Sequence, residues 1–85
     1  MKLLFTEQFK HCYFRLPAEI QDQVDHKLEL LLSNSRHPSL QVKKMQGTSG
    51  IWEIRVTQKH RITFESEGNL YVLRKVGNHD VLRRP

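Results

Sequence analysis

The chain has 85 residues, 38% of them hydrophobic, so it can bury only one modest core and we expect a single domain over residues 1–85. Fourteen Lys and Arg against nine Asp and Glu give a net charge of +5, which suits a polyanion, an acidic protein partner or an anionic membrane surface. The single cysteine, Cys12, excludes an internal disulfide and is typical of a reducing compartment such as the cytoplasm. Leu3-Leu4-Phe5 is too short to span a membrane, so we expect no membrane partner.

The N-terminal half predicts a short strand and two helices. Lys2 to Phe5 reads as the strand, and Thr6 suits the N-cap of the first helix. Apolar residues at helical spacing mark one face of that helix: Phe9, Cys12, Tyr13 and Leu16. Pro17 suits the first position of the second helix, which runs to Asn34. Its apolar stripe is also at helical spacing: Ile20, Val24, Leu28, Leu31 and Leu32. The two helices should form a hairpin.

The C-terminal half predicts strands. A turn-rich connection over residues 33–38 and a loop or short extended piece over 40–45 lead to a strand that starts at Ile51. Two more strands follow, over residues 60–66 and 70–77, with a hairpin turn between them. The last strand is apolar on both faces and should be central. The order β–α–α–β–β–β predicts an α+β fold, with a helical hairpin packed on a small, mostly antiparallel sheet.

The first hairpin separates apolar from polar residues. Trp52, Ile54 and Val56 alternate with polar residues, the period of a strand with one buried face. A three-residue loop of Gln58, Lys59 and His60 would pair Val56 with Ile62 and Ile54 with Phe64. The other face then gathers the polar residues Glu53, Arg55, Thr57, Arg61 and Thr63.

This polar face offers the groups that RNA cleavage without a metal requires. Attack by a ribose 2′-hydroxyl needs a base, cations beside the phosphoryl oxygens and an acid for the leaving oxygen. Arg55 and Arg61 could bind a phosphate, and Glu53 or His79 could transfer a proton. Lys43 and Lys44 could hold the flanking backbone. An ordinary solvated ion cluster explains the same residues, and their spacing alone favours that interpretation.

Other chemistries lack their motifs. None of the five histidines is paired with another at helical spacing, and the chain has no CxxC. It also has no glycine-rich phosphate loop and no dinucleotide fingerprint. We therefore expect neither a metal nor a cofactor.

Three motifs together give the chain a family resemblance. They are Lys43-Lys44-Met45-Gln46-Gly47, the hairpin Trp52-Glu53-Ile54-Arg55-Val56…His60-Arg61-Ile62-Thr63-Phe64, and Val76-Gly77-Asn78-His79-Asp80. In this order and spacing, the chain resembles the toxins of bacterial type II toxin–antitoxin systems in the RelE/ParE superfamily.

The RelE/YoeB-like branch implies a cytoplasmic, metal-independent endoribonuclease that cuts mRNA in the ribosomal A site and inhibits translation. The resemblance implies that Arg61 and Arg55 stabilise the scissile phosphate and that His79 donates a proton. Glu53 is the candidate base, although some members have lysine there. The partners implied are the ribosome, mRNA and a cognate antitoxin, with RNA contacts at Lys43, Lys44, Lys59 and Arg74.

Two alternatives stay open. The ParE-like branch shares the fold but inhibits DNA gyrase and has no nuclease activity. A toxin-like domain with impaired catalysis would only bind an antitoxin or RNA. Many relatives carry an aromatic residue near the C-terminus, where this chain has Leu82 and Arg83.

Overall fold

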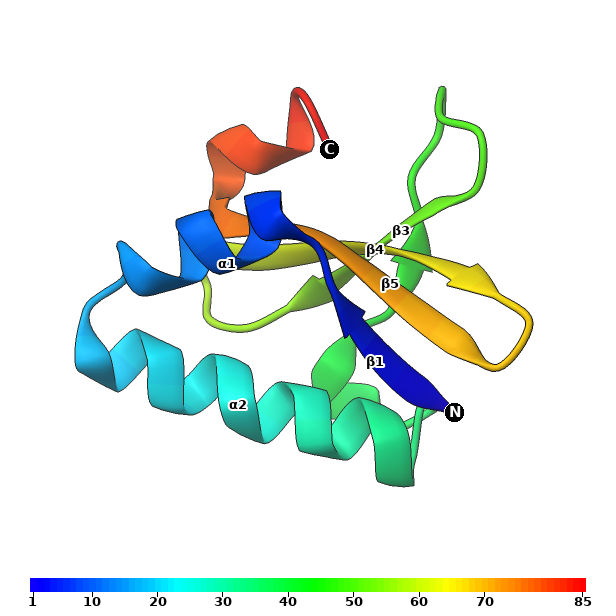
Figure 1. The fold of residues 1–85 in the computed structure, drawn as a ribbon, viewed down its shortest axis with the longest axis horizontal. Coiled ribbons are helices and arrows are strands. Elements are labelled where there is room, and N and C mark those ends of the chain that lie inside the picture. Colours follow the sequence, from blue (N-terminus) through cyan, green and yellow to red (C-terminus); the bar gives the residue numbers. More distant parts are fainter.

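The computed structural model describes residues 1–85 and consists of two helices and a five-stranded sheet in the order β1-β5-β4-β3-β2 (Figure 1). The elements are β1 (Lys2–Phe5), α1 (Glu7–Phe14), α2 (Ala18–Ser33), the 3-10 helix η1 (Pro38–Leu40), β2 (Lys43–Lys44), β3 (Ile51–Arg55), β4 (His60–Glu67), β5 (Leu70–Asn78) and the 3-10 helix η2 (His79–Leu82). Only β1 and β5 pair in parallel. The predicted α+β class and mostly antiparallel sheet are confirmed.

Local contacts fix the start of each helix. The Oγ1 of Thr6 accepts a hydrogen bond from the Phe9 amide at 3.1 Å, as predicted for an N-cap, and donates to the Leu73 carbonyl at 2.7 Å. This second bond ties α1 to β5, which lies between β1 and β4 in the sheet. The helix ends at Phe14, so it is shorter than the apolar spacing predicts. Pro17 is the N-cap of α2 and not its first helical residue.

The core lies between the helices and one side of the sheet. It consists of eleven buried residues: Phe9, Val24, Leu28, Leu31, Leu40, Ile54, Val56, Ile62, Phe64, Leu73 and Val76. The stripe on α2 is confirmed except near its end. There Leu32 is 44% exposed, whereas Leu30, which the stripe leaves out, packs against the core.

The predicted register of the first hairpin is wrong by two residues. Ile54 pairs with Ile62 and Trp52 with Phe64, and the loop covers residues 56–59 and not the predicted 58–60, so Thr57 lies inside it. The reason is the Thr57 side chain, whose Oγ1 accepts hydrogen bonds from the amides of Lys59 at 3.1 Å and His60 at 3.0 Å. A shift of two residues keeps every side chain on its predicted face.

Different segments of the chain cover the two sides of the sheet. Figure 1 shows α2 on one side, with the C-terminal segment and the connection between β2 and β3 on the other. The strand β5 continues to Asn78, one residue beyond the prediction, and η2 follows directly. Leu82 is half-buried and lies outside the core cluster. Neither helix is long and apolar enough to cross a membrane.

Candidate functional site

The side of the sheet away from α2 carries two rows of polar residues, which we call the polar face. Lys43, Glu53, Thr63 and Lys75 are successive partners across β2, β3, β4 and β5. Arg55 and Arg61 are partners in the adjacent row. Because residues paired across strands share a face, the hairpin brings Glu53, Arg55 and Arg61 together as predicted.

Several of these polar groups are withdrawn from solvent. Glu53 is 8% exposed, Arg61 is 9% exposed and Thr63 is fully buried. Charged residues are seldom buried unless they are paired, so the structure excludes an ordinary solvated ion cluster at Glu53 and Arg61. The C-terminal segment contributes to this cover, because the Thr63 hydroxyl donates to the Pro85 carbonyl at 3.3 Å.

The hairpin loop holds the Arg61 guanidinium. Its Nη1 donates to the carbonyls of Thr57 at 2.7 Å, His60 at 3.0 Å and Gln58 at 3.2 Å. The Nε lies 3.9 Å from Glu53 Oε1, and Nη2 has no hydrogen-bond partner. Arg61 is thus fixed in place, with one nitrogen of its guanidinium still able to bind an oxygen of a ligand.

Glu53 lies between two cations. Its Oε1 is 3.9 Å from Lys43 Nζ and 3.9 Å from Arg61 Nε. Both distances exceed those of a hydrogen bond, so these are loose ion pairs. The Lys43 side chain is 73% exposed, whereas that of Arg61 is 11% exposed. Arg61 therefore provides most of the compensation for the Glu53 charge, because solvent screens the exposed lysine.

Arg55 is the more accessible arginine. It is half-buried, and its Nη1 donates to Gln41 Oε1 at 3.3 Å. Gln41 has a left-handed backbone with φ of 46°, which directs the chain from η1 into β2. Sequence reasoning missed Gln41 and placed Thr57 in a strand on the polar face, whereas Thr57 lies in the hairpin loop. The turn-forming potential of a threonine two residues before Lys59 was a usable signal for Thr57, but no pattern indicated Gln41.

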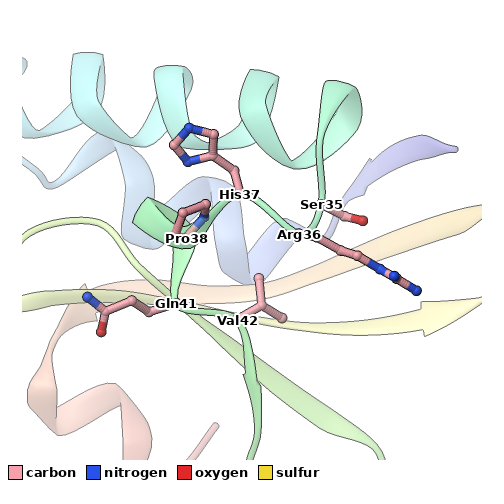
Figure 2. A pocket seen from close by; sticks show the side chains of 6 residues that line it. All are labelled: Ser35, Arg36, His37, Pro38, Gln41 and Val42. Carbon is pink, nitrogen blue, oxygen red and sulfur yellow. The ribbon is translucent and has the colours of Figure 1, made fainter.

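A hollow of about 340 Å³ lies at the connection that contains Gln41. Figure 2 shows that the side chains of Arg36 and Gln41 point to opposite sides of this connection. Its polar groups do not converge on one point, so the hollow adds no binding group to the polar face.

The other predicted residues are dispersed. His79 is exposed, begins η2 and makes no hydrogen bond or ion pair, although Asn78 before it pairs with His60 beside Arg61. Lys44 pairs with Trp52 and therefore lies on the opposite side of the sheet from Lys43. Lys59 is exposed in the hairpin loop. Arg74 forms an ion pair of 2.6 Å with Glu65.

The polar face therefore combines two arginines that are partners across the hairpin with a carboxylate. Two arginines can bind two oxygens of one phosphate, and the carboxylate can accept a proton beside it. No group of three or more His, Cys, Asp and Glu side chains could hold a metal ion.

No protein-family model and no curated protein sequence matches the chain. Solved structures do match. A YoeB/ParE toxin from Agrobacterium tumefaciens aligns with a TM-score of 0.79 and 19% identity, over 93% of this chain and 99% of that one. The RelB–RelE antitoxin–toxin complex from Methanococcus jannaschii aligns with a TM-score of 0.76 and 21% identity, over 94% of both chains. YafQ from E. coli aligns with a TM-score of 0.79 and 13% identity, also over 94% of both chains. The chain therefore has the RelE/ParE-like toxin fold.

Proposed function

We propose that this protein is the toxin of a type II toxin–antitoxin system and that it cleaves mRNA on the ribosome without a metal. The observation that carries the proposal is the placement of Arg55 and Arg61 beside Glu53 on the polar face. This arrangement occurs in a fold shared with YoeB-, RelE- and YafQ-like toxins over 93–94% of the chain.

The reaction assigns one role to each group. Arg55 and the free Nη2 of Arg61 bind the scissile phosphate and stabilise its growing negative charge. Glu53 accepts the 2′-hydroxyl proton as the 2′-oxygen bonds to phosphorus, and the bond from phosphorus to the 5′-oxygen breaks. His79 gives a proton to that departing oxygen. The products are a 2′,3′-cyclic phosphate and a 5′-hydroxyl, so atoms and charge balance.

The RNA and protein partners follow from charge and exposed apolar surface. Lys43, Lys59 and Arg74 lie on or beside the polar face, where they would hold the RNA backbone, while Lys44 would contact RNA from the edge of the sheet. For an antitoxin, the net charge of +5 favours an acidic segment. Phe5 and Phe14, 42% and 73% exposed, offer apolar contacts beside a hollow of about 310 Å³ between the helices.

Two observations favour a second function, that of a toxin-like protein that binds its target without cutting RNA. The Arg61 Nη1 is already bonded to three carbonyls, and His79 makes no hydrogen bond or ion pair with Glu53 or Arg61. Both facts suit a structural arginine and a solvated histidine. Inhibition of gyrase would be one form of this function.

Expression of the protein alone, followed by mapping of mRNA 5′ ends on translating ribosomes, tests the two functions against each other. The nuclease proposal expects growth arrest together with new 5′ ends in A-site codons. Arrest with intact messages and supercoiling-defective DNA would refute it and support gyrase inhibition.

The site assignment has its own test. His79→Gln and Arg61→Ala should each abolish arrest while antitoxin binding persists. His26→Gln is the matched control for the first variant, because His26 is an equally solvated histidine on α2. Full toxicity of either site variant would show that its assigned role is wrong.

A further inference from the structure

A second hollow of about 450 Å³ lies on the same side of the sheet as the polar face. It is walled by the connection between β2 and β3 on one side and by the C-terminal segment on the other, the two parts that rise from the sheet in Figure 1. Three cations line it, Arg74, Lys75 and Arg84, together with the hydroxyls of Thr48 and Ser49. No Asp or Glu side chain lines it.

A bulge in β5 explains why two adjacent cations face this hollow. Thr63 pairs with Lys75 and Phe64 pairs with Leu73, so Arg74 is an extra residue in the strand. In a regular strand Arg74 and Lys75 would point to opposite faces. Here the Arg74 Nε donates to the Pro85 carbonyl at 3.0 Å, and Lys75 Nζ donates to the neighbouring Arg84 carbonyl.

The cations keep unused hydrogen-bond donors. Arg74 is neutralised by Glu65 at 2.6 Å, but Lys75 and Arg84 have no acidic partner. The Arg84 guanidinium makes no hydrogen bond, and two of the three Lys75 ammonium hydrogens stay free. A positively charged hollow with free donors and two hydroxyls suits a phosphate group, whose oxygens accept several charge-assisted hydrogen bonds.

The position of the hollow relates it to the proposed active site. Glu53, Thr63 and Lys75 are successive partners across three strands, so Lys75 lies about 10 Å from Glu53, two strand spacings along the same face. A nucleic-acid strand bound through one phosphate at Arg55 and Arg61 would bring a flanking phosphate over the hollow. Ile51 is the only hydrophobic residue in the lining, so the hollow has no aromatic platform for a base.

We infer that this hollow, formed by Arg74, Lys75 and Arg84 with Thr48 and Ser49, is a binding site for a phosphate group. The group belongs either to the RNA strand, in which case the inference rests on the proposed function, or to a free phosphate ion. In both cases recognition is independent of base sequence, because the lining contacts only oxygens.

Amide-shift titrations of the ¹⁵N-labelled full chain test this inference. The probes are inorganic phosphate and a short 2′-O-methyl oligonucleotide that cannot be cleaved, each at constant ionic strength. We expect saturable shifts at the amides of Thr48, Ser49 and Arg84. Lys75→Gln and Arg84→Gln should each weaken binding at least about fivefold, and each should lower the salt-dependence slope by about one.

Lys2→Gln and Arg36→Gln are matched controls, because both side chains are exposed and lack a hydrogen bond or an ion pair. Binding of the oligonucleotide identifies the strand as the source of the phosphate. Binding of inorganic phosphate alone identifies the free ion. The inference is overturned if neither probe gives saturable shifts, or if Arg84→Gln and Arg36→Gln bind equally.

The outcome is separable from that of the proposed function. Ribosomal mRNA cleavage that is unchanged in a Lys75→Gln, Arg84→Gln double variant would remove the hollow from the mechanism and leave the nuclease intact. Saturable binding in the hollow by a protein that cuts no mRNA would support the phosphate site and refute the nuclease proposal.

Discussion

The two sides of the same hairpin exclude water by different means. Toward α2, Ile54, Ile62 and Phe64 are buried against other apolar side chains. On the polar face, Glu53 and Arg61 are almost as buried, yet loop carbonyls and an opposite charge surround them. Apolar burial stabilises a fold directly, whereas buried charges need geometry that compensates for lost hydration.

This difference predicts which side tolerates substitution. The apolar side needs only volume and hydrophobicity, so it depends on packing and little on particular partners. The polar side depends on specific partners, because loss of one leaves another charge uncompensated. A site of this kind is less stable than an apolar one would be, which is typical of groups retained for function.

The largest effect should come from the apolar side. Ile62→Ala removes a fully buried side chain in the middle of the sheet and should lower the free energy of unfolding by about 2–5 kcal/mol. Urea denaturation measures this loss. A loss below that of an exposed substitution such as Leu32→Ala would show that the core is not where the structure places it.

Glu53→Gln should have the next largest effect, about 1–3 kcal/mol, because it leaves the Arg61 guanidinium without its counter-charge. The loss of unfolding free energy caused by Glu53→Gln should be smaller in a protein that also carries Arg61→Gln. It should be unchanged in a protein that also carries Lys43→Gln. Double-mutant cycles measured by denaturation separate the two partners. Equal coupling to both would contradict the dominance of Arg61.

Thr57→Ala should cost about 1 kcal/mol, because it removes the hydroxyl that organises the hairpin loop. A less ordered loop should also hold the Arg61 guanidinium less firmly through its carbonyls, so amide hydrogen exchange should accelerate across residues 57–61. Thr57→Ser keeps the hydroxyl and should retain slow exchange. Equal exchange in the two variants would show that the hydroxyl does not order the loop.

The smallest effect concerns a polar contact outside both sides of the hairpin. Tyr13 donates a hydrogen bond of 2.7 Å to Asp25, and this bond, with burial and the nearby carboxylates, raises the pKa of Tyr13 to about 12. A raised pKa stabilises the protonated native state. That contribution is complete below pH 10, the ordinary tyrosine value, and is lost as the pH rises through about 12.

Tyrosinate absorbance measures the titration of Tyr13 as the step at the highest pH, and Asp25→Asn should move this step to lower pH. If the step were still present in Tyr13→Phe, it would belong to another group.

Patterns of period two and 3.6 were sufficient for the helices, the three long strands and the division of the hairpin into two faces. They could not give the register, because a shift of two residues preserves every face and only the Thr57 side chain decides between the alternatives. The bulge at Arg74 was likewise invisible, since both faces of β5 are largely apolar before it.

The candidate site shows the same limit. The sequence predicted the neighbourhood of Glu53, Arg55 and Arg61, because alternation and pairing determine it. The loop carbonyls that hold Arg61 and the C-terminal carbonyl that binds Thr63 are backbone groups, which have no signature in the sequence pattern. The resemblance implies His79 as a further site residue, and η2 leaves its side chain exposed and without a hydrogen bond or an ion pair.

The proposed cleavage of RNA by the polar face is best tested at Arg55, because its side chain is accessible and is not held by the hairpin loop. Purified ribosomes programmed with a defined mRNA, incubated with wild-type protein, Arg55→Gln or the exposed-surface control Arg36→Gln, measure the cleavage rate. We expect A-site cleavage that Arg55→Gln slows at least about tenfold, because one charge-assisted contact is lost, and that Arg36→Gln leaves unchanged. Equal rates for all three proteins, or no cleavage by the wild type, would contradict it.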